Sequence, residues 1–436
     1  MNYQQCLSYL ERIQSLGIKF GLENVRTVLK ELNNPHKTFP AIQIAGSNGK
    51  GSVCAMVTRI LTLHKLRCGL FTSPHLIEIE ERIRIGMNPI NRREFCDLLS
   101  FLKKVTQKLI DERKLKTPPT YFELLTILAV LYFFQEKVDI AVLEVGMGGR
   151  FDATTVVDPI ITAITTISEE HQEYLGTSLS QIAFEKAGII KPEIPVISGV
   201  IDEEAKRTIK AIAQELKAPF IDVFGEENCF AKKRINHNFL FKYTQNNETY
   251  EYSALLPGSH QGKNAVIAIN IANQINSNYR RLEKEKIIKG IESTEWEGRL
   301  EVISRKPLII MDGAHNIEGA KALREYITEF VGSVSVLVFA IMREKKIKEI
   351  SHILFPSAEK VILTMFGFHK SASPEEILSE TQGYENKIIC EALPEKALKA
   401  ALDTVDKDGS LLISGSLYIV GEMKKIIKEN EILPDI

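Results

Sequence analysis

The sequence has few features of a secreted, membrane-spanning or nucleic-acid-binding protein. Its six cysteines are scattered, with no Cys-x-x-Cys pair and no histidines at zinc spacing, so neither a disulfide framework nor a zinc site is indicated. The formal net charge of -1 lacks the basic excess that nucleic-acid binders usually carry. The longest apolar run, Leu124 to Phe134, is short of the roughly 20 residues that a membrane-spanning helix needs. Residues 1–16 mix charged and amide side chains into their apolar positions, unlike a secretory signal. These absences predict a cytoplasmic protein that binds neither nucleic acid nor membrane.

The chain is long enough for two domains, since 436 residues exceed what one hydrophobic core usually serves. Apolar segments alternate with segments of helical periodicity, which is typical of an α/β fold with a parallel sheet. The alternation restarts after residues 293–299, where we expect the first domain to end. Between Gly199 and Tyr252 the chain is more polar and alternates as antiparallel strands do, so we expect such strands at the edge of the first sheet.

A glycine-rich stretch, Ala45 to Ser52, separates an apolar strand-like run at 39–44 from a helical segment expected over 53–63. Glycines let backbone N–H groups turn inward and a helix N-terminus adds partial positive charge, so this position favours a phosphate. Lys50 adds a full charge. The usual phosphate loop has Ser or Thr directly after Gly-Lys, whereas here Gly51 intervenes. The stretch is therefore a variant phosphate loop, and the competing interpretation is an ordinary strand-to-helix turn with an exposed lysine.

Four polar side chains follow apolar strand-like segments: Lys50, Ser73, Glu144 and His171. Parallel sheets bind ligands at the carboxyl ends of their strands, so we expect these groups to meet in one cleft. Glu144 either forms a structural ion pair or holds a metal ion, because a buried carboxylate is costly without a positive partner. His171 by itself is either a hydrogen-bonded core histidine or a ligand, and Mg²⁺ generally prefers oxygen.

Further candidates each have an ordinary explanation. From the residues alone, Lys186 is interpreted as a solvated lysine at a helix end. Asp312 and His315 lie in a strand-to-helix turn and either contact a ribose and a phosphate or belong to a helix cap. Asn264 opens a helix, and Arg299 lies at the expected domain boundary, where it either clamps a phosphate chain or stays on the surface.

Taken together, these motifs resemble the folylpolyglutamate and dihydrofolate synthases, the folate branch of the Mur-ligase-like amide-bond-forming enzymes. The matching stretches span nearly the whole chain in the family's order, at 46–52, 72–76, 120–123, 144–154, 185–190, 256–265, 298–301, 312–316 and 415–418. The sequence departs from the family pattern at Glu170, where Asp is common, and at Glu297, where Pro is usual. Ser168 and Thr155 are smaller departures.

The resemblance implies a phosphate-loop ATPase domain with a parallel sheet and a folate site over residues 1–296. A smaller, Rossmann-like α/β domain is implied over residues 297–436. In the implied reaction, the γ-phosphate of ATP passes to a folate carboxylate, and the amine of L-glutamate attacks the resulting acyl phosphate. The implied substrates besides ATP and L-glutamate are reduced folates or dihydropteroate, and a monomer is expected. The alternatives are a muramyl-peptide ligase acting on a UDP-sugar and a nucleotide-binding protein without ligase activity.

The resemblance also implies roles for individual residues. Lys50, Lys186 and His171 are implied to be catalytic, with Lys186 carbamylated. Two Mg²⁺ sites are implied, with ligands at Ser73, Glu144, His171 and the carbamylated Lys186. The implied ATP contacts are Asn48, Gly49, Lys50, Gly51, Ser52, Asn264, Arg299, Asp312 and His315. The implied pterin-side contacts are Thr120, Tyr121, Phe122, Glu123, Phe151, Asp152 and Ala153.

Overall fold

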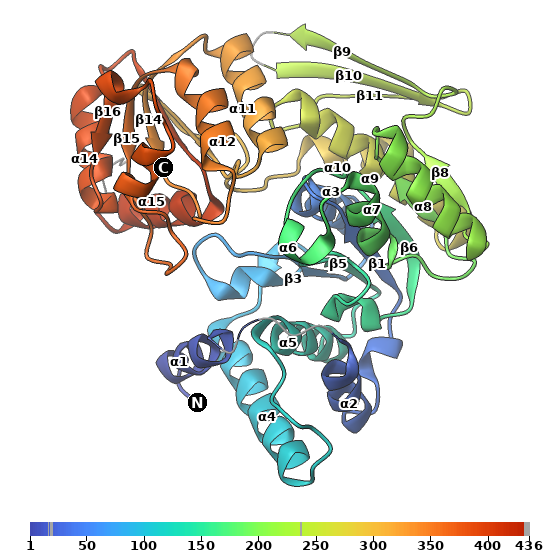
Figure 1. Cartoon of the computed structure of the whole chain (residues 1–436). Helices are drawn as coiled ribbons and strands as arrows, with labels where there is room; N and C mark the ends of the chain where they lie inside the picture. The colour runs from blue at the N-terminus through green and yellow to red at the C-terminus, as the bar shows by residue number, and fades with distance from the viewer. Residues whose placement is uncertain (16, 18–20, 236–237, 431–436) are drawn as a thin grey trace.

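The computed structural model describes residues 1–15, 17, 21–235 and 238–430. These residues form three sheets, of eight, three and six strands. Figure 1 shows the six-stranded sheet and its helices, coloured orange to red, as a second lobe beside the lobe that contains the eight-stranded sheet. None of the described helices has both the length and the apolar content that a membrane span requires.

The eight-stranded sheet has the order β4-β3-β2-β5-β1-β6-β7-β8. Its strands are β1 (Ala41–Ala45), β2 (Cys68–Phe71), β3 (Ile83–Ile85), β4 (Asn88–Pro89), β5 (Ile140–Glu144), β6 (Pro159–Ile164), β7 (Val196–Ser198) and β8 (Phe220–Asp222). The strands β2-β5-β1-β6-β7-β8 pair in parallel. The strands β3 and β4 are antiparallel and form one edge of the sheet. Every residue of β1 and β5 is buried, as expected for central strands with helices on both faces. The predicted parallel sheet is confirmed, whereas the antiparallel edge and the short strands β7 and β8 were not predicted.

Helices cover both faces of this sheet. They are α1 (Tyr3–Gln14), α2 (Glu23–Glu31), α3 (Lys50–Leu63), α4 (Arg92–Asp111), α5 (Tyr121–Gln135), α6 (Gln172–Leu175), α7 (Leu179–Ala187), α8 (Glu203–Glu215), α9 (Ser259–Asn278) and α10 (Lys284–Glu292). Strand residues alternate between the faces: Ala41 and Leu143 belong to the core with α1, α2, α4 and α5, whereas Ile42 and Val142 belong to the core with α3, α9 and α10. The helix expected over 53–63 begins earlier, at Lys50, so the glycine-rich stretch runs directly into its first turn.

The expectation of antiparallel strands at the edge of the first sheet is wrong in one respect. The strands β9 (Cys229–Ile235), β10 (Asn238–Gln245) and β11 (Glu248–Tyr252) exist and are antiparallel, but they form a sheet of their own. Their buried aromatic residues, among them Phe241 and Tyr252, join the core that includes α9 and α10. The alternating pattern therefore reports a half-buried sheet packed on helices, as the separate three-stranded layer in Figure 1 shows.

The six-stranded sheet has the order β12-β13-β17-β14-β15-β16. Its strands are β12 (Glu301–Arg305), β13 (Leu308–Asp312), β14 (Val334–Phe339), β15 (Ala358–Leu363), β16 (Ile388–Cys390) and β17 (Ser410–Ser414). Only β12 is antiparallel to its neighbour. The helices α11 (Ile317–Phe330), α12 (Ile347–Leu354), α13 (Pro374–Ser379), α14 (Pro394–Thr404) and α15 (Leu417–Glu429) pack in two cores, one on each face.

The strand order places the expected site residues at one edge of the first sheet. Strand β1 pairs with β5 on one side and with β6 on the other, and β2 lies beyond β5. The carboxyl ends of these parallel strands and the segments that follow them carry Lys50, Ser73, Glu144 and His171. The connection from β1 leads to β2 on one side, whereas the connection from β5 leads to β6 on the other side of β1. The strand order thus reverses here, and open α/β sheets bind ligands in the crevice at such a point.

Candidate active site

The glycine-rich loop between β1 and α3 needs glycine at two positions. Gly46 has φ 145° and Gly49, which caps α3, has φ 84°, conformations that side-chain-bearing residues rarely adopt. A Cβ on Gly46 would collide with Thr165, and one on Gly49 with the Asn264 side chain. Gly49 is thus held against a residue expected to contact ATP. The loop leaves the first N–H groups of α3 facing outward, where a phosphate is favoured.

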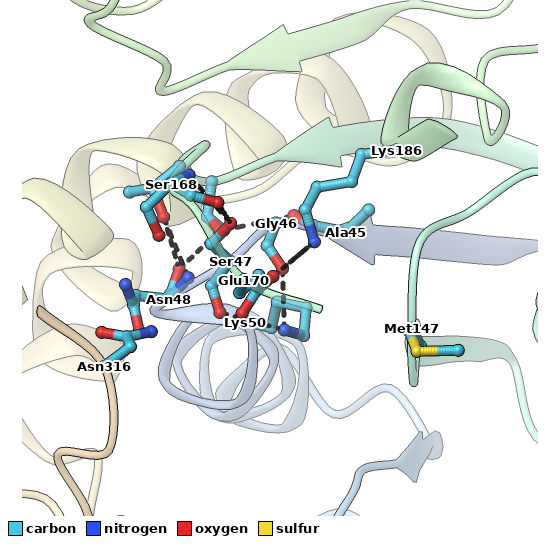
Figure 2. Close-up of polar contacts among 12 residues, drawn as sticks. Ala45, Gly46, Ser47, Asn48, Lys50, Met147, Ser168, Glu170, Lys186 and Asn316 are labelled. Carbon is cyan, nitrogen blue, oxygen red and sulfur yellow. Dashed lines mark hydrogen bonds and ion pairs between the residues drawn. The ribbon is translucent and has the colours of Figure 1, made fainter. Parts of the chain in front are cut away.

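Lys50 is folded back over this loop. Its Nζ donates to the carbonyl oxygens of Gly46, at 2.7 Å, and of Ser47, at 3.2 Å. Figure 2 shows these bonds together with a contact from the second lobe, in which Asn316 Nδ2 donates to Asn48 Oδ1 at 2.9 Å. The loop is therefore held in shape by its own lysine and is touched by both lobes.

A cavity of about 1750 Å³ lies at this loop and is lined by both lobes. It collects all the residues for which a role was expected except Lys186: Asn48, Gly49, Lys50, Gly51, Ser52, Ser73, Thr120, Tyr121, Phe122, Glu123, Glu144, Phe151, Asp152, Ala153, His171, Asn264, Arg299, Asp312 and His315. Groups that are distant along the chain thus share one space, while their individual roles stay predictions.

Glu144 is buried at the cavity, and no charged side chain of the described residues forms an ion pair with it. It is 5% exposed, and its Oε2 accepts a hydrogen bond from the Ser73 backbone N–H at 3.0 Å. Burial raises the pKa of Glu144, and the nearby charge of Lys50 offsets part of that rise. Within the described residues no cation forms an ion pair with Glu144, so the structural ion pair, one of the two interpretations left open, is not formed. A carboxylate in that position is suited to hold a cation.

The interpretation of Lys186 as a solvated lysine is wrong, because its side chain is 2% exposed. Its Nζ donates to Glu170 Oε1 at 2.7 Å and to the Gly46 carbonyl oxygen at 3.0 Å, so it lies behind the phosphate loop (Figure 2). Burial, the largest single cause, raises the pKa of Glu170, but the nearby positive charges, Lys186 first and then Lys50, together outweigh it and hold that pKa well below its usual range. Burial lowers the pKa of Lys186, and Glu170 opposes the shift.

His171, the residue after Glu170, begins the short helix α6 with φ 47°. Burial, followed by the charge of Lys345, lowers the pKa of His171 to about 4. Its imidazole is therefore neutral at pH 7 and keeps a lone pair for a ligand. The described residues contain no group of three or more His, Cys, Asp or Glu side chains arranged to hold a metal ion. A cation at Ser73, Glu144 and His171 would thus complete its coordination with hydroxyl, phosphate and water oxygens.

On the side of the cavity formed by the second lobe, the Asp312 carboxylate accepts hydrogen bonds from backbone N–H groups. Its oxygens accept from the Leu300 N–H at 2.8 Å and the Ala314 N–H at 2.9 Å, while burial raises its pKa and Arg299 offsets part of the rise. The residue that caps α11 is Asn316, whose Oδ1 accepts from the Gly319 N–H. Asp312 therefore shapes the turn that carries Arg299 and His315 to the cavity.

At the opposite end of the cavity, two further carboxylates are structural. Glu123 Oε2 accepts from the Thr120 N–H at 2.7 Å, which caps α5. Asp152 accepts from the N–H groups of Gly146 and Met147 and so fixes the loop after β5. The aromatic side chains of Tyr121 and Phe122 are half-buried, and Phe151 is 46% exposed. This end offers flat apolar surface, which suits an aromatic ring.

Among the cationic residues that line the cavity without having been predicted are Lys345 and Arg82, neither of which is fully exposed. Lys345 belongs to a run of charges, Arg343 to Lys348, that looks like a solvated surface. It is half-buried, and burial lowers its pKa. Arg82 is 6% exposed and is the last residue of a short turn, Ile79–Arg82, that has no sequence motif of its own. No signal in the sequence distinguishes these two from surface cations.

Comparison with known proteins extends over the whole chain. The Mur ligase middle domain matches residues 44–272, and the Mur ligase glutamate ligase domain matches residues 298–417. The chain is 32% identical over 430 residues to the dihydrofolate synthase/folylpolyglutamate synthase of Bacillus subtilis, covering 98% of this chain and 99% of that protein. The solved structure of E. coli FolC in complex with DHPP and ADP is 27% identical, with a TM-score of 0.87 and 99% of both chains covered. The folylpolyglutamate synthase of Mycobacterium tuberculosis complexed with ADP is 26% identical, with a TM-score of 0.89 and coverage of 98% and 99%.

Two α/β lobes that share a cavity at a glycine-rich phosphate loop define a Mur ligase, and the chain belongs to that family. Within the family it belongs to the branch of dihydrofolate and folylpolyglutamate synthases, as the resemblance of its motifs predicted.

Proposed function

We propose that this protein is an ATP-dependent ligase that joins the amine of L-glutamate to a carboxylate of a folate. The observation that carries the proposal is the single cavity in which the loop around Lys50, the aromatic wall at Tyr121 and the turn at Asp312 face the same space. Such a cavity has room for a nucleotide at one end and a ring system at the other. Enclosure between two lobes also excludes water, which otherwise hydrolyses an acyl phosphate.

The reaction needs two steps because a carboxylate is a poor electrophile until it is phosphorylated. In the first, a folate carboxylate oxygen bonds to the γ-phosphorus of ATP as the bond from that phosphorus to ADP breaks. In the second, the glutamate amine bonds to the acyl carbon, inorganic phosphate leaves, and the amine loses a proton. Phosphoryl transfer depends mainly on positioning and charge neutralisation, which Lys50 and the N–H groups of the first turn of α3 provide.

Mg²⁺ at two positions is part of the proposal, and the residues present fit such a cation. Glu144 has no ion-pair partner among the described residues, and the Ser52 hydroxyl is buried beside the cavity without a hydrogen-bond partner there. Ser73, Glu144 and the neutral His171 would hold one ion. Bound Mg²⁺ neutralises phosphate oxygens and orients them. Oxygen donors from these side chains are of the type that Mg²⁺ prefers.

We expect Lys186 to carry a carbamate only when a cation lies beside it. Carbamylation replaces the ammonium by an anion, and the present ion pair with Glu170 at 2.7 Å would become two anions in contact. A cation between them removes that repulsion. Crystals grown with Mg²⁺ and bicarbonate should show carbamate density at Lys186. An unmodified ammonium still bound to Glu170 under those conditions would contradict the prediction.

The proposal also covers the oligomeric state, the cellular location, the roles of the two domains and the range of acceptors. We propose a monomer in the cytoplasm that acts on small molecules and not on nucleic acid, with residues 1–296 carrying the ATP and folate sites and residues 297–436 facing them. The near-zero net charge supports the exclusion of nucleic acid. Dihydropteroate is proposed as a second acceptor beside reduced folates.

The test is an assay with ATP, Mg²⁺ and L-glutamate in which ADP release is measured with tetrahydrofolate, dihydropteroate or a UDP-muramyl acceptor. We expect glutamate-dependent ADP release with tetrahydrofolate and with dihydropteroate, and none with the UDP-sugar. Turnover with the UDP-muramyl acceptor and with neither folate would show that the acceptor is the UDP-sugar and that the proposed folate substrate is wrong. ATP binding without turnover on any acceptor would refute a ligase.

A further inference from the structure

Arg82 is a buried cation that the proposed mechanism does not use. It ends the short turn Ile79–Arg82 and leads into β3. It is 6% exposed and lines the main cavity. A guanidinium keeps its charge in almost any surroundings, and a buried charge is costly unless an anion accompanies it. The partners of Arg82 therefore need an explanation.

The side chains in direct contact with Arg82 are neutral, although its charge also acts on the buried Glu144. Its Nε donates to His75 Nδ1 at 2.8 Å, and its Cζ lies 5.4 Å from the centre of the Tyr121 ring. Burial, followed by the charge of Arg82, lowers the pKa of His75 to about 3, so this histidine is a neutral acceptor. In the described part of the chain no carboxylate forms an ion pair with Arg82, and its Nη groups donate no hydrogen bond.

Arg84, two residues further along, differs from Arg82 because its guanidinium donates to backbone carbonyl oxygens. Its Nε donates to the Glu81 carbonyl oxygen at 2.8 Å and its Nη1 to the Met87 carbonyl oxygen at 3.0 Å. It also packs on an aromatic ring, that of Trp296, at 5.3 Å, and it lines a different cavity. Arg84 is thus tied to backbone, whereas the donors at the end of Arg82 are left for something else.

The surroundings of Arg82 place it between the two lobes. Tyr121 belongs to the aromatic wall of the first lobe, and Tyr418, which lines the same cavity, comes from the start of α15 in the second. Burial raises the pKa of Tyr418, and the positive charge of Arg82 opposes the rise, so the charge of Arg82 reaches this part of the cavity. Tyr418 is stacked on Phe366, at 5.5 Å, and on Phe368, at 5.1 Å. A phenol held by ring stacking and Arg82 thus line the same cavity, one from each lobe.

We propose that Arg82 binds a carboxylate of an amino-acid unit in the ligase reaction, in the part of the cavity that Tyr121 and Tyr418 also line. The carboxylate belongs either to the incoming L-glutamate or to the glutamyl unit already carried by the folate. This subsite rests on the proposed function. A guanidinium presents paired N–H donors that match a carboxylate in a two-bond arrangement, which an ammonium cannot reproduce.

The test compares the wild-type protein with Arg82→Lys and Arg82→Met, and uses Arg84→Lys as the matched control. The KM values for L-glutamate, tetrahydrofolate and ATP are measured separately, together with kcat. We expect Arg82→Lys to raise one of the first two KM values roughly tenfold or more, and Arg82→Met to raise it further, because charged hydrogen bonds are lost. The KM for ATP should stay within about twofold, and so should all three values in Arg84→Lys.

Each outcome decides a point. A raised KM for L-glutamate assigns the subsite to the incoming amino acid, and a raised KM for tetrahydrofolate assigns it to the glutamyl unit of the folate. Unchanged KM values in a folded Arg82→Lys protein would overturn the subsite and leave Arg82 a structural partner of His75 and Tyr121. If the wild type itself lacks turnover, the proposed function fails. The rise in melting temperature caused by each ligand then tests Arg82 separately: loss of the rise in Arg82→Lys supports the subsite, and an equal rise refutes it.

Discussion

Replacement of Lys50 by alanine is expected to lower kcat at least about 1000-fold, because the loop then lacks its one full positive charge at the transferring phosphoryl group. The protein should stay folded. Within the described residues, Lys50 Nζ donates to two carbonyl oxygens: that of Ser47, which lines the cavity, and that of Gly46, which also accepts from Lys186. Water entering there can replace the lost donor. The measurements are steady-state ADP release and the thermal unfolding midpoint of both proteins.

The control for this prediction is Lys321→Ala. Lys321 lines the same cavity, is 60% exposed and pairs with Glu318 at 2.9 Å. Its loss removes the same charge from the molecule, and exposed pairs contribute little to stability. We expect its kcat to stay within about twofold of wild type. A kcat for Lys50→Ala within about tenfold of wild type would show that Lys50 does not neutralise the phosphoryl group.

The parts of the fold that depend on local pattern were predictable from the sequence. The apolar run expected at 39–44 contains the buried strand β1, which extends to Ala45, and the apolar run before Glu144 forms the buried strand β5. Strands β7 and β8 have three residues each, too few for a periodic pattern. The separation of β9 to β11 into their own sheet depends on packing against α9 and α10, which are distant in sequence.

The location of the site was predictable for a physical reason. The burial and the contacts of its lysine and arginine side chains were not. Parallel strands that carry polar residues at their carboxyl ends must present them at one edge, and this rule brought Lys50 and Glu144 to one cavity. Whether a lysine is solvated depends on which face of its helix meets a neighbour. Lys186 was misjudged because its partner Glu170, in the loop after β6, was not visible as a contact. Arg82 was missed for the same reason, since its freedom from carboxylates is a property of the whole cavity.

Glu144→Gln is expected to change activity and stability in opposite directions. Glutamine keeps the shape of the side chain and an oxygen that can accept from the Ser73 N–H. In the wild type this N–H donates to Glu144 Oε2 at 3.0 Å. It removes the charge that we propose holds Mg²⁺, so kcat should fall at least about 100-fold. It also removes a buried anion without an ion-pair partner among the described residues, so the variant should unfold at a higher temperature than the metal-free wild type at pH 7. Such a trade of activity against stability is expected where a site keeps an unfavourable group for function.

The pH dependence and the effect of Mg²⁺ separate this account from a purely structural role of Glu144. Burial raises the pKa of Glu144, so the folded protein holds this proton more tightly than the unfolded chain. The stability contribution of this group is therefore full below the unfolded pKa of about 4.3 and is lost as pH rises through the folded pKa. The advantage of Glu144→Gln should be largest at pH 7 and should shrink as pH falls toward that value. Mg²⁺ should raise the unfolding temperature of the wild type and leave the variant unchanged. A variant that is less stable at pH 7, or that gains as much from Mg²⁺ as the wild type, would remove Glu144 from the cation site.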